Sequence, residues 1–168
     1  KTPYLRMCFS PLAKSFPRTD SSIVASVDYT HVLDLEGGFE HVWRNRFTKK
    51  KRNSILSARK RGVQIENCHS LSDVASCYRV YLDLVERRRI ISHAPLPPLP
   101  ALFESIYRLI PTGLVDFLLA EINGQVVGWL ICFSFGTYTN AFLTACLSEY
   151  LRFNVSSLLL CTGIEHAI

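Results

Sequence analysis

The dipeptide Asn123-Gly124 constrains the fold most, because it separates two long apolar runs, LVDFLLAEI at 114–122 and QVVGWLICFSF at 125–135. Asn-Gly favours the two-residue turn of a β-hairpin, since both residues accept the left-handed backbone that this turn requires. The two runs are therefore predicted to pair as antiparallel strands. Their apolar character indicates that both are largely buried.

A further strand and a helix are predicted after this hairpin. Gly136 predicts another turn, and TYTNAFLTACL at 137–147 returns as a third strand. A polar turn follows at 148–152, and VSSLLLCTGIEHAI predicts a helix that begins near Asn154. The carboxyl-terminal part of the chain thus reads as a three-stranded meander and a helix.

The segment before the meander is predicted to begin with a strand and a long helix. THVLDL at 30–35 alternates like a short strand. Helical periodicity starts at Phe39 and ends at Gly62, which has the position of a helix C-cap after a basic last turn. VQIE at 63–66 is a second short strand.

Two more helices are expected before residue 114. Ser70 and Asp73 have the spacing of an N-cap and a first-turn acid, and this helix is predicted to run to about Arg89. SHAPLPPLP at 92–100 is an extended proline-rich connector. A third helix follows at about 101–110, and Pro111 is expected to stop it.

Domain boundaries follow from these patterns. Residues 1–29 are irregular and read as a leader, and 30–168 read as one domain. The chain begins with Lys1 and ends inside a predicted helix, so we expect this domain to be truncated at its carboxyl end.

The environment of the protein is indicated by its cysteines and apolar runs. Six scattered cysteines in a long, apolar chain are expected to be reduced, which indicates a cytoplasmic protein. The apolar runs are shorter than the roughly 20 residues that a membrane helix needs. The histidines and cysteines lack the paired spacing of a zinc site, so no metal is expected. The oligomeric state cannot be predicted.

Basic residues are concentrated in one segment. Nine of the nineteen Lys and Arg residues lie between Arg44 and Arg61, although the net charge of the whole chain is only +5. On a helix, Lys49, Arg52 and Arg59 would project opposite an aromatic and aliphatic stripe. A basic patch on an otherwise acidic body indicates a site rather than general binding of polyanions.

Three interpretations of this basic helix remain open. It is a solvated face, a contact for tRNA or for the diphosphate of a precursor, or a free DNA-binding arm. The aromatic stripe of Phe39, Trp43 and Phe47 argues against a free arm, because these rings need a core to pack on.

The predicted order of elements resembles the first two-thirds of the GNAT acyltransferase fold, an α/β fold with a mixed, mostly antiparallel sheet flanked by helices. Two segments, LDLEGGFEHVWRNRFTKKKRNSILSARKRGVQIE and LLAEINGQVVGWLICFSFGTYTNAFLTACLSEYLRFNVSSLLLCTGIEHAI, resemble the FemAB-like transferases of that superfamily. The resemblance implies that the last strands of the fold are missing here.

The FemAB resemblance also implies a function. Such enzymes transfer an acyl or aminoacyl group to an amine in the biosynthesis of peptidoglycan or other cell-envelope polymers. The donor would be aminoacyl-tRNA or acyl-CoA, and the acceptor an amine-bearing envelope precursor. The amine must lose a proton, and the tetrahedral oxyanion must be stabilised.

One departure from the superfamily concerns the start of the last helix. Acyl-CoA enzymes of this fold bind pyrophosphate with a glycine-rich turn, whereas residues 152–157 read RFNVSS and contain no glycine. Asn154 has the residue type of an N-cap, which is one explanation of this stretch. An anion site formed by Arg152, Asn154, Ser156 and the helix amides is the other.

Candidate site residues follow from these arguments. For donor or substrate binding they are Lys49, Arg52, Arg59, Arg152, Asn154 and Ser156. Tyr138, Asn140 and Thr144 are predicted to share one side of the third strand, and Tyr138, Asn140 and Glu149 are the candidates for catalysis. The alternative function is a non-catalytic module that binds RNA or another polyanion through the 44–61 helix.

Overall fold

The structure is a computed structural model that describes residues 31–88 and 99–168. The chain divides into two compact units, Lys1–Asp34 and Leu35–Ile168, and all helices and strands named below belong to the second unit. The predicted leader at 1–29 and most of the proline-rich connector lie outside the described residues.

Four antiparallel strands form one sheet in the order β1-β2-β3-β4. The predicted meander and its hairpin turn are confirmed, because Asn123 and Gly124 both have positive φ angles of 52° and 74°. The strands are β1 (Gln64–Asn67), β2 (Val115–Ile122), β3 (Gln125–Phe135) and β4 (Tyr138–Cys146).

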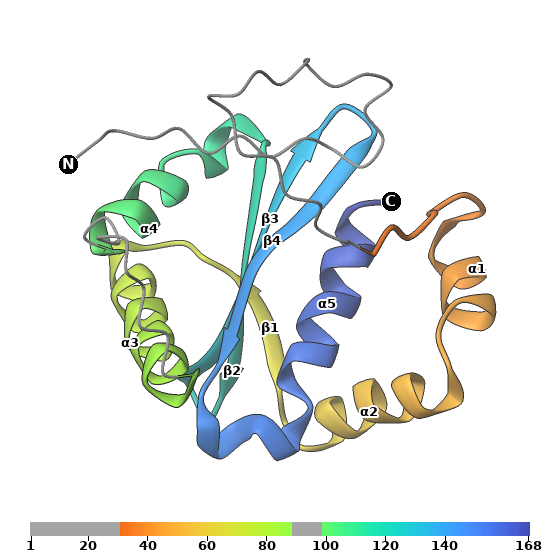
Figure 1. Cartoon of the computed structure of the whole chain (residues 1–168), viewed down its shortest axis with the longest axis horizontal. Helices are drawn as coiled ribbons and strands as arrows, with labels where there is room; N and C mark the ends of the chain where they lie inside the picture. Colours follow the sequence, from red (N-terminus) through yellow and green to blue (C-terminus); the bar gives the residue numbers. More distant parts are fainter. Residues whose placement is uncertain (1–30, 89–98) are drawn as a thin grey trace, which may run out of the picture. The chain divides into compact units, whose positions relative to one another are not determined.

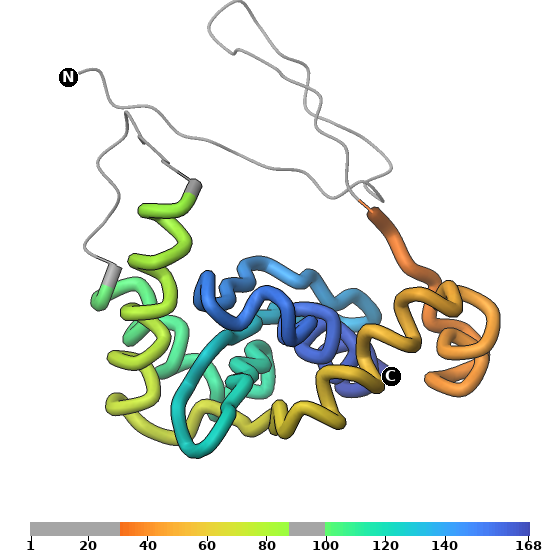
Figure 2. The backbone as a smooth tube through the Cα atoms, turned by 90° about the horizontal axis from the view of Figure 1, so that it is seen from below, coloured from red at the N-terminus to blue at the C-terminus, as the bar shows by residue number. Residues whose placement is uncertain are grey.

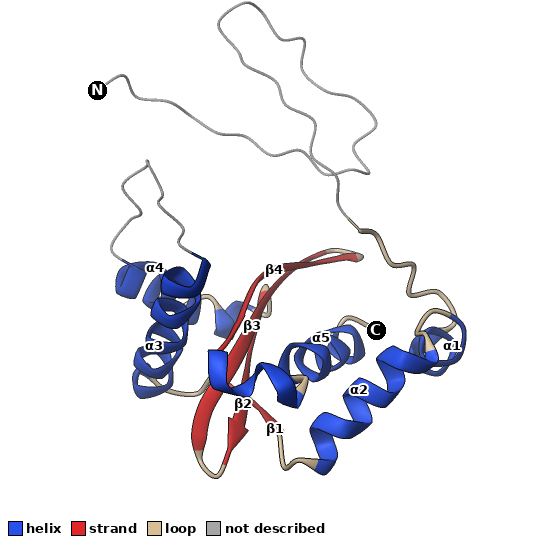
Figure 3. Ribbon diagram, turned by 60° about the horizontal axis from the view of Figure 1, so that its bottom comes forward, coloured by secondary structure: helices blue, strands red, loops and turns tan. Residues whose placement is uncertain are grey.

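Helices cover both faces of the sheet (Figure 1). α3 and α4 lie against one face, and α5 lies against the other (Figure 3). α2 packs against α5, and the view from below shows the two groups of helices on opposite sides of the strands (Figure 2). The helices are α1 (Gly38–Asn45), α2 (Lys49–Lys60), α3 (Leu71–Arg88), α4 (Leu99–Tyr107), α5 (Val155–His166) and the short 3-10 helices η1 (Ile110–Thr112) and η2 (Ser148–Phe153).

The face under α3 and α4 is built around Trp129. The indole ring is fully buried and makes edge-to-face contacts with the rings of Phe103 and Phe117, at centroid distances of 5.1 and 6.3 Å. Its Nε1 donates a hydrogen bond to the carbonyl of Cys77 at 3.0 Å. Trp129 therefore fixes α3 to the sheet by both packing and a buried hydrogen bond.

The face under α5 depends on a close approach between helix and strand. A Cβ added at Gly128 would lie 2.8 Å from Cγ1 of Val155 and 3.0 Å from the carbonyl oxygen of Ala145. Only a residue without a side chain allows α5 to approach β3 this closely.

The first strand of the sheet was placed wrongly by the sequence. Residues 31–35 are described and contain no strand, so the alternation in THVLDL does not correspond to one. The sheet begins with β1 at Gln64. The strand–helix–helix part of the GNAT-like order consists of β1, α3 and α4. Both α1 and α2 therefore precede the first strand of the GNAT-like order.

The predicted single helix from Phe39 to Gly62 is also wrong, because it is broken at residues 46–48. Thr48 has an extended backbone and its hydroxyl accepts from the N–H of Lys51, so it caps α2. The predicted end of α2 is confirmed: Gly62 has a φ of 79° and its N–H bonds back to the carbonyl of Arg59.

The next two helices differ only in their bounds. The Asp73 carboxylate accepts from the N–H of Ser70 at 3.0 Å while the Ser70 hydroxyl accepts from the N–H of Asp73, so the predicted cap of α3 is confirmed. α4 begins at Leu99 and includes the end of the predicted connector. It ends at Tyr107, and Pro111 lies in η1 instead.

A β-bulge in β4 separates residues that the sequence placed on one side. The register runs from Ile131↔Leu143 to Cys132↔Ala141, so Phe142 is an extra residue. Beyond a bulge, the alternation of side chains between the two faces is shifted by one residue. Thr144 consequently lies on the α5 face, and Tyr138 and Asn140 lie on the face of α3 and α4.

Candidate functional site

The start of α5 is a helix N-terminus without a side-chain cap. Asn154 ends η2 with a left-handed backbone, φ 60°, and occupies the N-cap position without a side-chain cap hydrogen bond. Capping by the Asn154 side chain, which the residue type suggested, is therefore not found. The first turn of α5 contains no acid. The N–H groups of Val155 and Ser156 have no partner within the helix, whereas that of Ser157 donates to the Asn154 carbonyl at 3.0 Å. These groups form the positive end of the helix dipole.

The turn before α5 is held from the α2 side by Arg61. The Nη1 of Arg61 donates to the carbonyl oxygen of Arg152, across 91 positions of sequence. The guanidinium groups of Arg61 and Arg152 lie 5.3 and 5.5 Å from the centroid of the Phe153 ring. Cation–π contacts of this kind fix both side chains on the ring. Arg152 is thus beside the start of α5, although it rests on Phe153.

The other end of this turn is held from α3. The carboxylate of Asp83 accepts from the N–H and from the hydroxyl of Ser148, at 3.0 and 2.9 Å. Arg87 donates to the carbonyl of Cys146 at 3.4 Å. The segment between β4 and α5 is therefore held by elements on both faces of the sheet, so its position is largely preorganised.

The three cations predicted to act together on the basic helix point to different places. Nη1 of Arg52 donates to backbone carbonyls of the α1 region, including that of Phe47 at 2.6 Å and that of Trp43 at 3.0 Å. Arg59 pairs with Glu165 at 3.7 Å. Of the three, only Lys49 lines the cavity described next.

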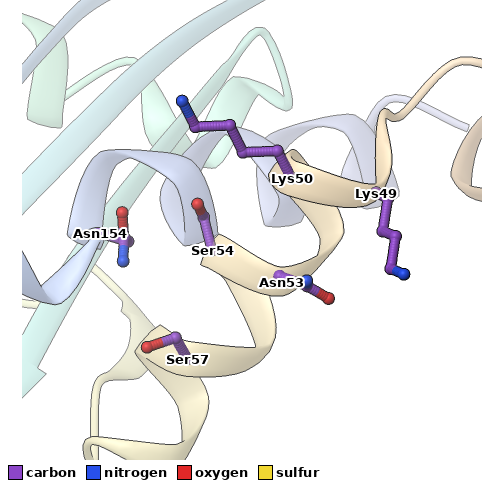
Figure 4. Close-up of a pocket in the computed structure, with 6 residues that line it drawn as sticks. All are labelled: Lys49, Lys50, Asn53, Ser54, Ser57 and Asn154. Atoms are coloured by element: carbon purple, nitrogen blue, oxygen red, sulfur yellow. The ribbon is translucent and has the colours of Figure 1, made fainter.

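A shallow, open cavity of about 470 Å³ lies between α2 and the turn before α5. Ser54 and Ser57 project from α2 on the side of Asn154, and Lys50 extends on the same side, whereas Lys49 and Asn53 extend away from it (Figure 4). The lining residues are Lys49, Lys50, Asn53, Ser54, Ser57 and Asn154.

Sequence reasoning missed Lys50, Ser54 and Ser57 as candidate site residues. Their spacing of four and three positions places them on one face of a helix, and this signal was available in the sequence. The predicted helix was too long, however, and its charge pattern favoured the cations at 49, 52 and 59 instead. Ser156 is partly buried in the first turn of α5 and, unlike Asn154, does not line this cavity.

A second, smaller cavity of about 260 Å³ lies between α2 and α5. Ile55 and Cys161 line it from the two helices, together with Lys51 and Ser157. The Nζ of Lys51 donates to the Ser157 hydroxyl at 3.4 Å. Lys51 is therefore used in the contact between the helices, while Lys50 is exposed beside the larger cavity.

The candidates on and after β4 do not gather at the start of α5. Tyr138 and Asn140 are exposed and lie on the opposite face of the sheet. Thr144 donates from its hydroxyl to the carbonyl of Trp129 at 2.8 Å, so its polar group is occupied within the sheet. Glu149 is exposed in the first turn of η2. Their catalytic roles stay predictions.

The described cysteines are free and buried, at positions 68, 77, 132, 146 and 161. Burial raises the pKa of Cys68 to about 11 and raises the pKa of Cys77 further still. Such thiols are protonated at neutral pH and are poor nucleophiles. Within residues 31–88 and 99–168, no three His, Cys, Asp or Glu side chains form a group that could hold a metal ion.

Comparison with known families agrees with this geometry. Residues 44–168 match the model of the acetyltransferase (GNAT) domain. The chain belongs to the GNAT acetyltransferase domain family. The predicted fold class is thereby confirmed, since the GNAT match accompanies an α/β architecture with an antiparallel sheet flanked by helices. No curated protein matches the chain.

Family membership gives the site a chemical class. A GNAT domain supports transfer of an acyl group to an amine, so the chain is an acyltransferase domain in this general sense. The GNAT match includes the whole of α2, although α2 precedes the first strand. Within the described part of the chain, no helix combines the length and the apolar character needed to cross a membrane.

Proposed function

We propose that this domain transfers an acyl or aminoacyl group from a phosphate-bearing donor to an amine of a cell-envelope precursor, as in peptidoglycan biosynthesis. The donor is aminoacyl-tRNA or acyl-CoA, both of which carry phosphate groups. The observation that supports this proposal most directly is the start of α5, where a GNAT domain presents an open helix terminus beside Asn154.

The proposal gives the residues of this turn distinct roles. The first amides of α5 and the Ser156 hydroxyl donate to a phosphate oxygen of the donor. Asn154 supplies the left-handed backbone that a glycine provides in a glycine-rich turn. Arg152 contributes positive charge beside the turn while its guanidinium rests on Phe153. Since the turn contains no glycine, side chains limit how closely the phosphate approaches.

Lys49, Arg52 and Arg59 take different parts in this proposal. Lys49 adds positive charge on α2, although its side chain extends away from the turn (Figure 4), and Arg59 adds charge from the side of Glu165. Arg52 acts by positioning α1 against α2 rather than by contacting the donor. Glu149, Tyr138 and Asn140 are retained as candidates for accepting the amine proton or orienting the acceptor.

Substitution of Asn154 tests the donor site. Asn154→Asp places a carboxylate at the turn, and like-charge repulsion is expected to raise the KM for the donor about tenfold with a small effect on kcat. Transfer would be measured by mass spectrometry with acyl-CoA and aminoacyl-tRNA supplied separately. Equal KM values for the variant and the unchanged chain would contradict the proposed donor site.

The chain offers a matched control for this experiment. Asn123 is the other non-glycine residue with a positive φ in the described ranges. Asn123→Asp makes the same chemical change in the hairpin turn, where Asp-Gly is also favoured. We expect it to leave the donor KM unchanged, which would separate a local effect at α5 from a change in total charge.

One observation favours the second candidate function, a module that binds RNA or another polyanion. Lys49, Lys50 and Lys60 are exposed on α2 and form no ion pair with any residue that the structure describes. The affinity for RNA through such a face would fall steeply as the salt concentration rises. Asn154→Asp would lower this affinity only by the amount expected for one added negative charge. A titration of RNA at two salt concentrations distinguishes this function from acyl transfer.

A further inference from the structure

The smaller cavity lies in the seam between α2 and α5, which run side by side with α1 at the start of α2 (Figure 3). Its apolar lining comes from Phe47, Ile55, Leu160, Cys161 and Ile164. It shares no lining residue with the larger cavity beside Asn154. The seam is therefore a place distinct from the proposed donor site.

The cavity has an apolar floor and a cationic mouth. Ile55 and Cys161 are fully buried and form the floor, whereas Arg46 and Lys51 also line the cavity but are exposed. No carboxylate lines it. Neither Arg46 nor Lys51 forms an ion pair with any residue in the described part of the chain. The mouth is therefore suited to an anion, and the floor to a hydrocarbon.

The volume sets the size of the apolar part of a ligand. Protein interiors are close-packed and have few voids larger than a water molecule, so an apolar space of about 260 Å³ between two helices is unusual. An apolar cavity of about 150 Å³ is known to bind benzene, so this one has room for roughly ten carbon atoms. One aliphatic chain fills it, whereas the two chains of a phospholipid do not fit.

The donors at the mouth favour a carboxylate as the charged group. The Nζ of Lys51 lies 3.4 Å from the Ser157 hydroxyl, and its ammonium group has two further N–H donors for a ligand. The guanidinium group of Arg46 has the planar fork that matches the two oxygens of a carboxylate. Both cations can therefore act on one carboxylate.

We propose that this cavity binds a free aliphatic carboxylate of about eight to ten carbon atoms. The chain lies between Ile55, Cys161 and Ile164, and the carboxylate accepts hydrogen bonds from Lys51 and Arg46. The bound ligand covers apolar surface of both helices and so holds α2 against α5. The inference is independent of the proposed function, because it uses none of the residues of the donor site.

A series of chain lengths tests the apolar part of the site, with binding to the whole chain followed by calorimetry. Octanoate should bind saturably, and each methylene removed from it should weaken binding about threefold. Dodecanoate should bind no more tightly than decanoate, because the cavity is then full. Octanol, which lacks the charge, should bind about tenfold more weakly than octanoate. Affinity that rises steadily to dodecanoate, or equal binding of octanol, would indicate partition onto apolar surface and overturn the proposal.

Lys51→Gln tests the cationic mouth and should weaken octanoate binding about tenfold. Its matched control is Lys50→Gln, because Lys50 is also exposed on α2 but does not line this cavity. The control removes the same charge and should weaken binding less than about twofold, as expected for a screened charge. Equal weakening by the two variants, or absence of saturable binding to the unchanged chain, would overturn the proposal.

Leu160→Asp tests the wall that α5 provides. Leu160 is 38% exposed, so the substitution should leave the fold intact, and the new carboxylate should repel octanoate and weaken its binding at least tenfold. Leu56→Asp is the control, because Leu56 is 44% exposed on α2 and does not line the cavity. An equal loss of binding in the two variants would contradict the proposed location.

Amide hydrogen exchange of the unchanged chain places the ligand without any substitution. Octanoate should slow exchange in peptides covering 49–60 and 155–166, because the bound chain holds these two helices together. Peptides covering 71–85 in α3 should exchange at the same rate with and without octanoate. Binding that leaves exchange in both α2 and α5 unchanged would refute a site in this seam.

Discussion

Replacing Arg52 by alanine should release α1 without unfolding the sheet. Nη1 of Arg52 lies 3.0, 3.2 and 2.6 Å from the carbonyl oxygens of Trp43, Arg44 and Phe47. A nitrogen with two hydrogens satisfies two such acceptors well, and a hydrogen bond to a charged group contributes roughly 1.5–3 kcal/mol. Because the three acceptors share one nitrogen and Arg52 is only half-buried, we expect a loss of about 1.5–3 kcal/mol in total.

Amide hydrogen exchange measures this loss locally. Free energies of about 1.5–3 kcal/mol correspond to exchange that is roughly 10- to 150-fold faster in peptides covering residues 38–47. Peptides from β2 and β3 should keep their protection, because the hydrogen bonds of Arg52 go to the carbonyls of residues 43, 44 and 47 rather than to the sheet. Arg52→Lys serves as the control for charge, since it keeps the positive charge but cannot reproduce the guanidinium geometry.

The outcome decides between two roles for Arg52. If it positions α1, both variants accelerate exchange at 38–47, and Arg52→Lys leaves the KM for the donor nearly unchanged. Unchanged exchange in both variants, together with a raised KM for the donor in Arg52→Ala, would refute the positioning role. Arg52 would then be a ligand residue, as its place on the basic helix suggested.

Three further predictions concern the core. Gly128→Ala should lower the free energy of unfolding by about 1–3 kcal/mol in a urea titration, because the added Cβ would collide with Val155. Unchanged stability would mean that α5 shifts freely. Trp129→Phe should cost about 1–3 kcal/mol, because it removes the indole hydrogen bond to the Cys77 carbonyl and leaves volume unfilled in the core. A loss below roughly 0.5 kcal/mol would contradict this. Because burial raises the pKa of the described cysteines, in Cys68 from 9.0 to about 11, the stability linked to their protonation is complete below pH 9 and is lost as the pH rises towards 11. A urea midpoint that falls as steeply over this interval in Cys68→Ala as in the unchanged chain would exclude a contribution from Cys68.

Local signals in the sequence predicted the local structure well. Asn123-Gly124 fixed the hairpin turn and the pairs beside it, Ile122↔Gln125 and Glu121↔Val126, because the turn leaves few alternatives; a register shift between Ala120 and Glu121 changes the pairing beyond them. Gly62 and the Ser70–Asp73 pair predicted helix ends for the same reason: each provides a specific backbone hydrogen bond that depends only on its neighbours.

The misplaced elements needed tertiary information. The break between α1 and α2 is marked by Thr48, an ordinary N-cap residue, but the aromatic periodicity continues across it and concealed it. THVLDL alternates in sequence, yet alternation gives no strand without a neighbouring strand to pair with. The bulge at Phe142 has no clear mark in its own residues, and it moved Thr144 to the other face.

The candidate site was predictable only in part. Asn154 and the start of α5 could be located from the apolar pattern of the last helix. The contacts of Arg52, Arg59 and Arg61 could not, because each side chain is directed by a partner that is distant in sequence or on another element. The clustering of charge predicted that basic side chains gather on α2. It did not predict which of them lie beside the turn before α5.

The placement of α2 has a consequence for the smallest piece of this protein that can fold alone. A chain trimmed to start at Val63 would keep every strand of the sheet, and would look complete if judged by the sheet. It would lose Ile55 and Ala58, which are fully buried, and would leave the neighbouring side chains of α5, such as Cys161 and Ile164, exposed to water. Exposed apolar surface of this kind promotes aggregation. The autonomous folding unit therefore includes a helix that lies outside the sheet and before its first strand.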